Sequence, residues 1–149
     1  MNVEPGSNEA SVTVADGPFA GPVLGRVVGM LAARADCPID RLDDALLIAD
    51  AVAAKAGSFS PDGRVNVCVL AEIGSVEFVV GPLRPDGADG LVESAALPGV
   101  GNVLERIADE LEPEQRNGDG DGDGEYLRIR LGFDAQRPSM IDRMGPDAS

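Results

Sequence analysis

Two adjacent runs of β-branched residues constrain the fold of this chain more than any other feature. The runs "RVNVCVLA" and "SVEFVVG" are separated only by "EIG", so they are expected to form an antiparallel β-hairpin. Further strands are expected at residues 9–15 ("EASVTVA") and 126–133 ("YLRIRLGF"). Because strands and helices do not alternate along the chain, the pattern predicts an α+β two-layer sandwich, in which helices cover one face of a mixed or antiparallel sheet.

Two amphipathic segments predict most of the helical layer. The first runs from Pro22 to about Ala35, and the second, "RLDDALLIADAVAAKAG", covers residues 41–57. The inner stripe expected for the first helix consists of Val23, Leu24, Val27, Val28 and Leu31. A loop rich in proline and glycine follows the hairpin. After a short helical region, "LVESAAL", an amphipathic helix is expected to run through Leu111 in "LPGVGNVLERIADELEP". The expected order of elements is β-α-α-β-β-(loop)-α-β.

The length of 149 residues corresponds to one domain with tails. Residues 9–133 are expected to form that domain, with an acidic Gly/Asp linker at 117–124 inside it. Residues 1–8 are expected to be a flexible N-terminus and residues 134–149 a disordered tail. Only four Phe, one Tyr and no Trp are present, so Val, Leu, Ile and Ala must fill most of the core.

The composition excludes several classes of function. Histidine is absent, which removes an imidazole base, Ser-His and Cys-His nucleophiles and His-ligated zinc. The formal net charge of −14 makes nucleic acids and anionic membranes unsuitable partners, because phosphate binding needs a Lys/Arg surface. The chain has neither an apolar run of about 18 residues nor a signal-peptide pattern, so a cytoplasmic location is expected. In that location the isolated Cys37 and Cys68 are expected to be ordinary thiols.

Three stretches, in their order along the chain, resemble one known ATPase fold. "LDDALLIADAVAAKA" looks like its motif helix, "LPGVGNVLERIADEL" like the glycine motif that opens its final helix, and "GEYLRIRL" like its closing strand. This fold is shared by histidine kinases, gyrase and Hsp90-type proteins. The branch that the chain resembles is that of the bacterial anti-sigma factors, which are small serine kinases. The resemblance covers residues 9–133.

The resemblance implies where a nucleotide site would lie. Asp50 stands in the place of the family's glutamate, a base that positions water or a hydroxyl. Gly99 and Gly101 remain of the loop beside the triphosphate, and Arg84 is the cation near the expected site. These four residues are the candidates for a catalytic base and for nucleotide binding.

Two departures from the family's pattern indicate that this site has lost its chemistry. Ala54 stands where an asparagine holds magnesium, and it has no ligand atom. Gly81 and Pro82 stand where an aspartate reads adenine. No cofactor and no metal site are therefore expected, and no residue is assigned as catalytic.

Each candidate also has a purely structural interpretation. Asp50 is then an acid on the flank of a helix, either exposed or paired with Arg26 or Arg34 of the neighbouring helix. The segment "PGVGN" is then a turn that enters a helix, with Gly99 at positive φ.

The main expectation is a non-enzymatic regulatory domain of bacterial transcription that binds a protein, such as a sigma factor or an anti-sigma antagonist. A homodimer is a further option. One alternative is a working ATP-dependent serine kinase or ATPase with magnesium-ATP bound, Asp50 as its base and the two glycines as its phosphate loop. A second alternative is a small acidic α+β module that binds cations weakly. Its ligands would be Asp119, Asp121 and Asp123, which have the spacing of the first three ligands of an EF-hand loop.

Overall fold

The computed structural model describes residues 3–4, 7–99, 101–116 and 124–133 of the chain. Of the linker expected at 117–124, residues 117–123 with the three aspartates lie outside these residues, and so does the tail expected at 134–149, whereas Gly124 begins the last strand. The strands are β1 (Val3–Glu4), β2 (Ser7–Ala15), β3 (Arg64–Glu72), β4 (Ser75–Leu83), β5 (Ala96–Leu97), β6 (Gly101–Asn102), β7 (Glu110–Arg116) and β8 (Gly124–Gly132). The helices are α1 (Ala20–Arg34), α2 (Ile39–Lys55), α3 (Gly87–Ser94) and α4 (Val103–Ile107), with a 3₁₀ turn η1 (Ala56–Phe59) after α2.

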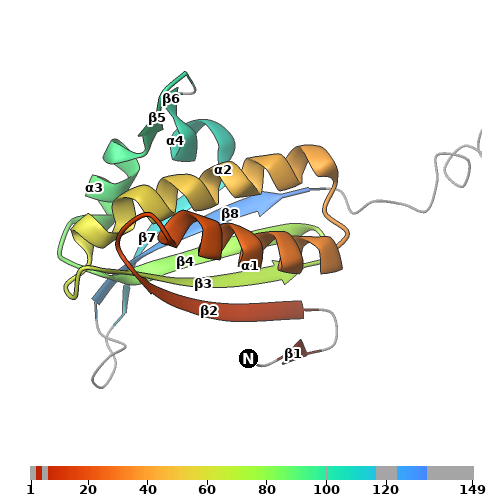
Figure 1. The fold of residues 1–149 in the computed structure, drawn as a ribbon, viewed down its shortest axis with the longest axis horizontal. Helices are drawn as coiled ribbons and strands as arrows, with labels where there is room; N and C mark the ends of the chain where they lie inside the picture. The colour runs from red at the N-terminus through yellow and green to blue at the C-terminus, as the bar shows by residue number, and fades with distance from the viewer. Residues whose placement is uncertain (1–2, 5–6, 100, 117–123, 134–149) are drawn as a thin grey trace, which may run out of the picture.

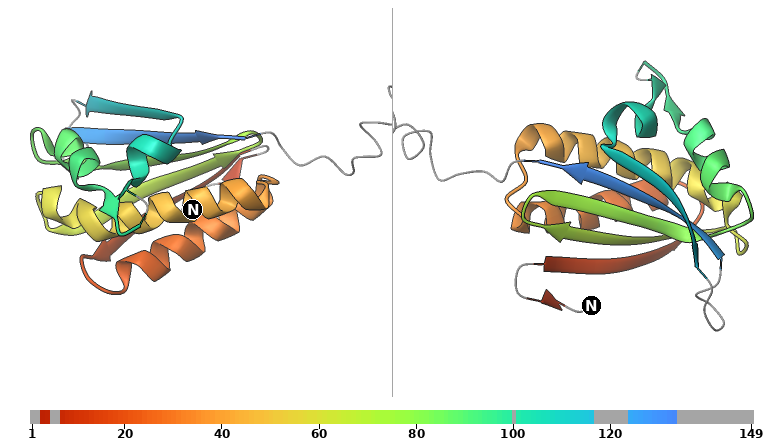
Figure 2. Two further views of the ribbon diagram at one scale, coloured as in Figure 1. Left: turned by 90° about the horizontal axis from the view of Figure 1, so that it is seen from above. Right: turned by 180° about the vertical axis from the view of Figure 1, so that it is seen from behind.

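The described elements form two layers. Strands β1-β2-β3-β4-β8-β7, in this order, make one antiparallel sheet, and β5 and β6 form a separate short pair. The helices lie on one face of the large sheet, and its other face carries none of them (Figures 1 and 2). α1 packs on β2 and β3, and α2 lies between α1 and the pair α3 and α4. The expected α+β two-layer sandwich with an antiparallel sheet is confirmed.

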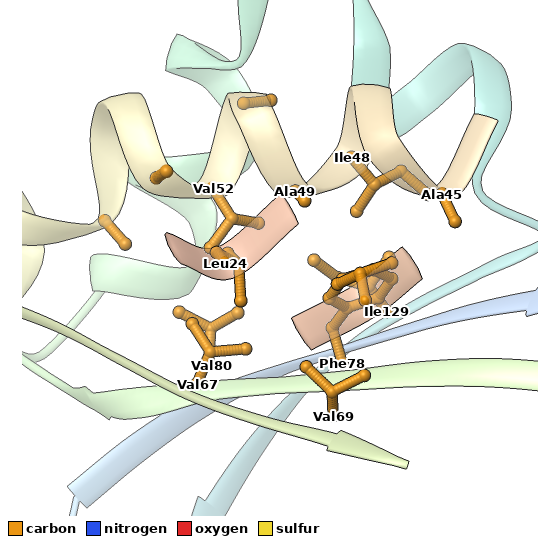
Figure 3. Close-up of a cluster of buried hydrophobic side chains, with 14 of the residues drawn as sticks. Leu24, Ala45, Ile48, Ala49, Val52, Val67, Val69, Phe78, Val80 and Ile129 are labelled. Carbon is orange, nitrogen blue, oxygen red and sulfur yellow. The ribbon is translucent and has the colours of Figure 1, made fainter. Parts of the chain in front are cut away.

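The core lies between the sheet and the helices and consists almost entirely of aliphatic side chains. Along β3 the burial alternates, with valines turned to the helices and Asn66, Cys68 and Leu70 turned to the open face. Ile48 and Val52 of α2 point down toward the sheet, whose side chains Phe78, Val80 and Ile129 face them (Figure 3). Ala45 and Ala49 lie on the same buried side of α2 (Figure 3).

The hairpin at the centre of the sheet is confirmed. β3 and β4 pair from Val67 opposite Val80 to Glu72 opposite Ser75, and Ile73 and Gly74 form the turn. Gly74 has a φ of +97°, which a residue with a side chain rarely adopts. None of the helices in the described residues is long and apolar enough to cross a membrane.

The last expected helix is wrong beyond Ile107. α4 ends there, Ala108 is extended, and residues 110–116 form the edge strand β7, so the observed order contains elements that the expected order lacks. Pro113 cannot continue a helix but is tolerated on an edge strand. The backbone N–H of Asp109 donates to the carbonyl of Arg130 over 2.9 Å, which starts the pairing of β7 with β8.

The inner stripe of α1 also differs from the expected one. The buried residues are Ala20, Leu24, Val28, Leu31 and Ala32. Val23, which was expected among them, is 38% exposed. α2 lies on the side of Gly25, because a Cβ on that glycine would be 3.9 Å from Leu46. At about 100° per residue, Val23 lies about 200° from Gly25 and is turned away from α2.

Candidate functional site

Asp50 lies on an exposed flank of α2. Its Oδ1 is 3.7 Å from the point where a Cβ on Gly21 would stand, so the carboxylate is turned toward the start of α1. Within the described part of the chain it forms no ion pair with Arg26 or Arg34. Ala54, one turn further along α2, is also exposed. The position that would hold magnesium in the resembled family therefore carries only a methyl group, at the surface.

The other candidates lie on different elements. Arg84 follows β4 directly, has an exposed side chain, and donates its backbone N–H to the carbonyl of Phe59 over 2.7 Å. Gly99 lies between the short strands β5 and β6 and has a φ of +78°. Gly101 is the first residue of β6 and has a φ of +86°. No hydrogen bond or ion pair among the described residues joins Asp50, Arg84 and these glycines.

The start of α3, the helix N-terminus next to Arg84, already holds a carboxylate. Oε2 of Glu125 accepts the N–H of Ala88 over 2.7 Å, and Oε1 accepts the N–H of Asp86 over 3.3 Å. Free N–H groups at a helix start are a ready site for phosphate. Glu125 of β8 occupies this one, and its negative charge opposes a second anion there.

The space between α2 and the pair α3 and α4 is filled by apolar side chains. Ala51, Leu91 and Leu104 are fully buried. Asn102 ties α3 to α4, since its Nδ2 donates to the carbonyl of Val92 over 2.7 Å and its Oδ1 accepts the N–H of Glu105 over 3.1 Å. The close packing leaves α4 held against α2.

The residues present do not fit magnesium-ATP as the resembled family holds it. Ala54 offers no oxygen to the metal, Asp50 is turned toward α1, and Glu125 closes the helix N-terminus beside Arg84. Among the residues that the structure describes, no three Cys, Asp or Glu side chains come together in a way that could hold a metal ion.

The open face of the sheet carries a hollow of about 250 Å³ that the sequence did not indicate. Tyr126 lies at its side, with the guanidinium of Arg116 4.5 Å from the ring centroid, and the ring crosses β4 at Gly81. Only the absence of a side chain at Gly81 makes room for the ring, because a Cβ there would be 2.6 Å from Tyr126 Cδ2. Asp50, Arg84, Gly99 and Gly101 do not line this hollow.

Cys68 also lines the hollow, and its thiol donates to Oε1 of Glu9 over 3.2 Å. Burial, and then the hydrogen bond and negative charge of Glu9, raise the pKa of Cys68 from 9.0 to about 11. The thiol therefore stays protonated at neutral pH. A protonated thiol is a poor nucleophile, which argues against covalent chemistry at this residue.

The outer side of α1 exposes large apolar side chains. Phe19, at the N-cap, is 77% exposed, Met30 is 47% exposed and Val23 is 38% exposed. Positions 19, 23 and 30 are separated by four and seven residues, so they project from one side of the helix. We call these three residues the α1 apolar face. From the sequence, Val23 was expected on the buried side of this helix. The valine stripe is wide enough to cover both the buried and the exposed side, so the pattern alone does not separate the two.

Comparison with models of protein families and with curated proteins finds no match to this chain.

Proposed function

We propose that this chain is a regulatory protein-binding domain that resembles an anti-sigma factor and works without nucleotide chemistry. Its partner is a protein, such as a sigma factor or an anti-sigma antagonist, and its location is the cytoplasm, where free thiols such as Cys37 and Cys68 persist. The observation that carries the proposal is the α1 apolar face, which places Phe19, Val23 and Met30 in water.

The α1 apolar face has the composition of a protein interface. Burying a fully exposed Phe or Met side chain contributes about 1.5–3 kcal/mol, so a partner that covers both gains substantially. Aromatic residues, Met and Arg are enriched at interfaces, and Arg26 lies seven residues after Phe19 on the same side of α1. Phe19 and Val23 lie one turn apart and Met30 lies two turns further on, so the three side chains form a row along one side of the helix with Arg26 between them.

The site of the resembled kinases supports binding in place of catalysis. Ala54 supplies no metal ligand, and the described residues do not bring Asp50 together with Arg84 or the two glycines. The carboxylate of Glu125 stands where a phosphate would have to approach α3. We therefore infer that this domain acts by binding a protein at its surface.

Site-specific photocrosslinking tests the proposal. A benzoylphenylalanine at position 19, close in shape to the native Phe, is expected to form a covalent adduct with one protein in cells of the source organism. The same probe at Ile73, which is 71% exposed in the β3–β4 turn, is the control. The adduct should disappear when Met30→Ser is added. Adducts at both positions alike, or with no protein other than the chain itself, would contradict the proposal.

A further inference from the structure

The hollow on the open face of the sheet lies where side chains from several strands meet. In the pairing of β2 with β3, Ser11 lies opposite Cys68, and Thr13 lies opposite Asn66. Val79 of β4 lies opposite Cys68 on its other side. Every second side chain of a strand points to the same face, so these side chains stand together on the face that carries no helix (Figure 2). We call this feature the open-face hollow.

Tyr126 and Arg116 raise one side of the open-face hollow above the other. The ring of Tyr126 crosses β4 at Gly81, and the guanidinium of Arg116 lies over this ring, 4.5 Å from its centroid. On the side of β2 the lining consists of the short side chains of Ser11 and Thr13. The difference in side-chain length leaves a depression of about 250 Å³ between the two sides.

Arg116 brings a positive charge to the open-face hollow that its neighbours compensate only in part. Arg128, on the same face, pairs with Glu77 over 2.9 Å and with Glu114 over 3.3 Å. Arg116 has one ion pair within the described part of the chain, with the same Oε2 of Glu114 over 3.4 Å. One carboxylate is therefore shared between two guanidinium groups, and several N–H donors of Arg116 remain for a ligand.

The charge of the lining favours an anion. The described residues that line the open-face hollow include Arg116 and no acid, in a chain of −14. The charge of Arg116 extends over the hollow as far as β3, because burial and Glu9 raise the pKa of the Cys68 thiol and Arg116 opposes them. Glu9 accepts the hydrogen bond of that thiol over 3.2 Å and does not line the hollow. A positive lining in an acidic chain attracts an anion in preference to a cation.

The lining also offers hydrogen-bonding groups and apolar surface. Asn66 donates from Nδ2 to Asp62 over 3.4 Å, and its Oδ1 and the hydroxyl of Thr13 make no hydrogen bond among the described residues. Val79 and Pro82 are half-buried and add apolar surface. Ligand sites combine apolar surface with a few polar groups, and sites for drug-sized ligands have about 300–1,000 Å³. At about 250 Å³, the open-face hollow suits a smaller molecule.

We propose that the open-face hollow binds a small carboxylic acid with a flat apolar body, in its ionised form. The planar guanidinium of Arg116 matches a carboxylate, to which it can donate two parallel N–H bonds. Its stacking on Tyr126 fixes the orientation of this fork. The apolar body rests on Val79 and Pro82, and a polar substituent on the body reaches Thr13.

This site goes beyond the proposed function and does not depend on it. The open-face hollow lies on the face of the sheet opposite the helices, so a ligand there leaves the α1 apolar face free (Figure 2). The two surfaces can therefore be tested separately.

Protection of Cys68 from alkylation tests the site, with benzoate as the probe and iodoacetamide as the reagent. Cys68 lines the open-face hollow, whereas Cys37 lies between α1 and α2 and serves as a control in the same molecule. At a benzoate concentration about ten times its Kd, the rate at Cys68 should fall about tenfold and the rate at Cys37 should not change. Benzamide has the same shape without the charge, and inorganic phosphate has charge without the apolar body. Neither should protect Cys68 at the same concentration.

Two substitutions test whether Arg116 holds the carboxylate. Arg116→Gln should abolish protection by benzoate. Arg130→Gln removes the same charge from the open face but leaves the lining of the hollow unchanged, so protection should persist. Thr13→Trp, at an exposed position of β2, keeps Arg116 and fills the hollow, so benzoate should no longer change the rate at Cys68. Thermal melts of each variant show that it is folded.

Several outcomes would overturn the site. These are protection that persists in Arg116→Gln or Thr13→Trp, equal protection by benzamide or phosphate, and a native chain that benzoate does not protect. A chain without protection that still forms the Phe19 adduct would overturn this site alone and leave the proposed function standing.

Discussion

Gly81 is the residue at which packing on the open face depends most on a missing side chain. A Cβ at Gly81 would be 2.6 Å from the ring of Tyr126 and 2.9 Å from the carbonyl of Glu125, and its φ is +149°. Gly81→Ala is therefore expected to lower the free energy of unfolding by roughly 2 kcal/mol or more, through overpacking and backbone strain. Urea denaturation of the variant and the native chain measures this difference.

Gly29→Ala is the matched control for that substitution. Gly29 lies inside α1, and nothing comes within 4 Å of the point where its Cβ would stand. Alanine is favoured over glycine in a helix by about 1 kcal/mol, so this variant should be more stable than the native chain. If both substitutions raised the free energy of unfolding, the packing around Gly81 would be looser than described.

Cys68 gives a prediction that depends on pH. Since the folded state raises the pKa of this thiol to about 11, its alkylation rate should increase about tenfold per pH unit between pH 8 and 10. Between pH 9.0 and about pH 11 the thiol keeps its proton in the folded chain but has lost it in the unfolded chain. The free energy of unfolding should therefore fall as the pH rises through this window.

Glu9→Gln tests the cause of that pKa. The substitution removes the negative charge beside the thiol, so the pKa of Cys68 should fall and alkylation at pH 8 should become faster. Mass spectrometry of the modified peptide separates Cys68 from Cys37. An unchanged rate in the variant would mean that burial alone sets the pKa.

Among the elements, the start of α2 is tied to the end of β8 by one arginine. Arg41 donates to the carbonyl of Gly132 from Nε over 3.1 Å and from Nη2 over 2.9 Å, and it pairs with Asp109 over 2.8 Å. Arg41→Ala should lower the free energy of unfolding by about 1–3 kcal/mol, because half-buried charge-assisted hydrogen bonds are lost. Arg34→Ala, at the exposed end of α1, should change it by less than about 0.5 kcal/mol. Equal effects in thermal melts would show that Arg41 does not join the two elements.

The strands and helices that the sequence predicted correctly are those whose signal is local. The hairpin β3–β4 and the strand β2 follow from alternation within nine residues each. β7 was missed because Ile107 and Leu111 repeat at helical spacing, and its pairing with β8 is a contact between separate segments. The α1 apolar face was missed for a related reason. Which side of the valine stripe is buried depends on where α2 packs, and this cannot be read from α1 alone.

At the scale of the whole molecule, the fold alone does not decide whether the chain carries out chemistry, because the side chains on the helices decide it. The two-layer sandwich places α2 over the sheet (Figure 1), and α2 carries Ala54 and Asp50 on its exposed side. That residue 54 offers no ligand atom can be read from the sequence, because the residue type alone decides it. The sequence did not indicate that Glu125 would close the start of α3, since that contact joins residues 37 apart.

A thermal melt with and without saturating magnesium-ATP tests the proposal that this domain works without nucleotide chemistry. A ligand at 100 times its Kd adds about 2.7 kcal/mol to stability, which corresponds to a rise in Tm of roughly 5–10 °C for a domain of this size. If the proposal is correct, no shift in Tm is expected, because the residues present do not fit magnesium-ATP. A rise of that size would contradict it and would restore the kinase alternative with Asp50 as its base.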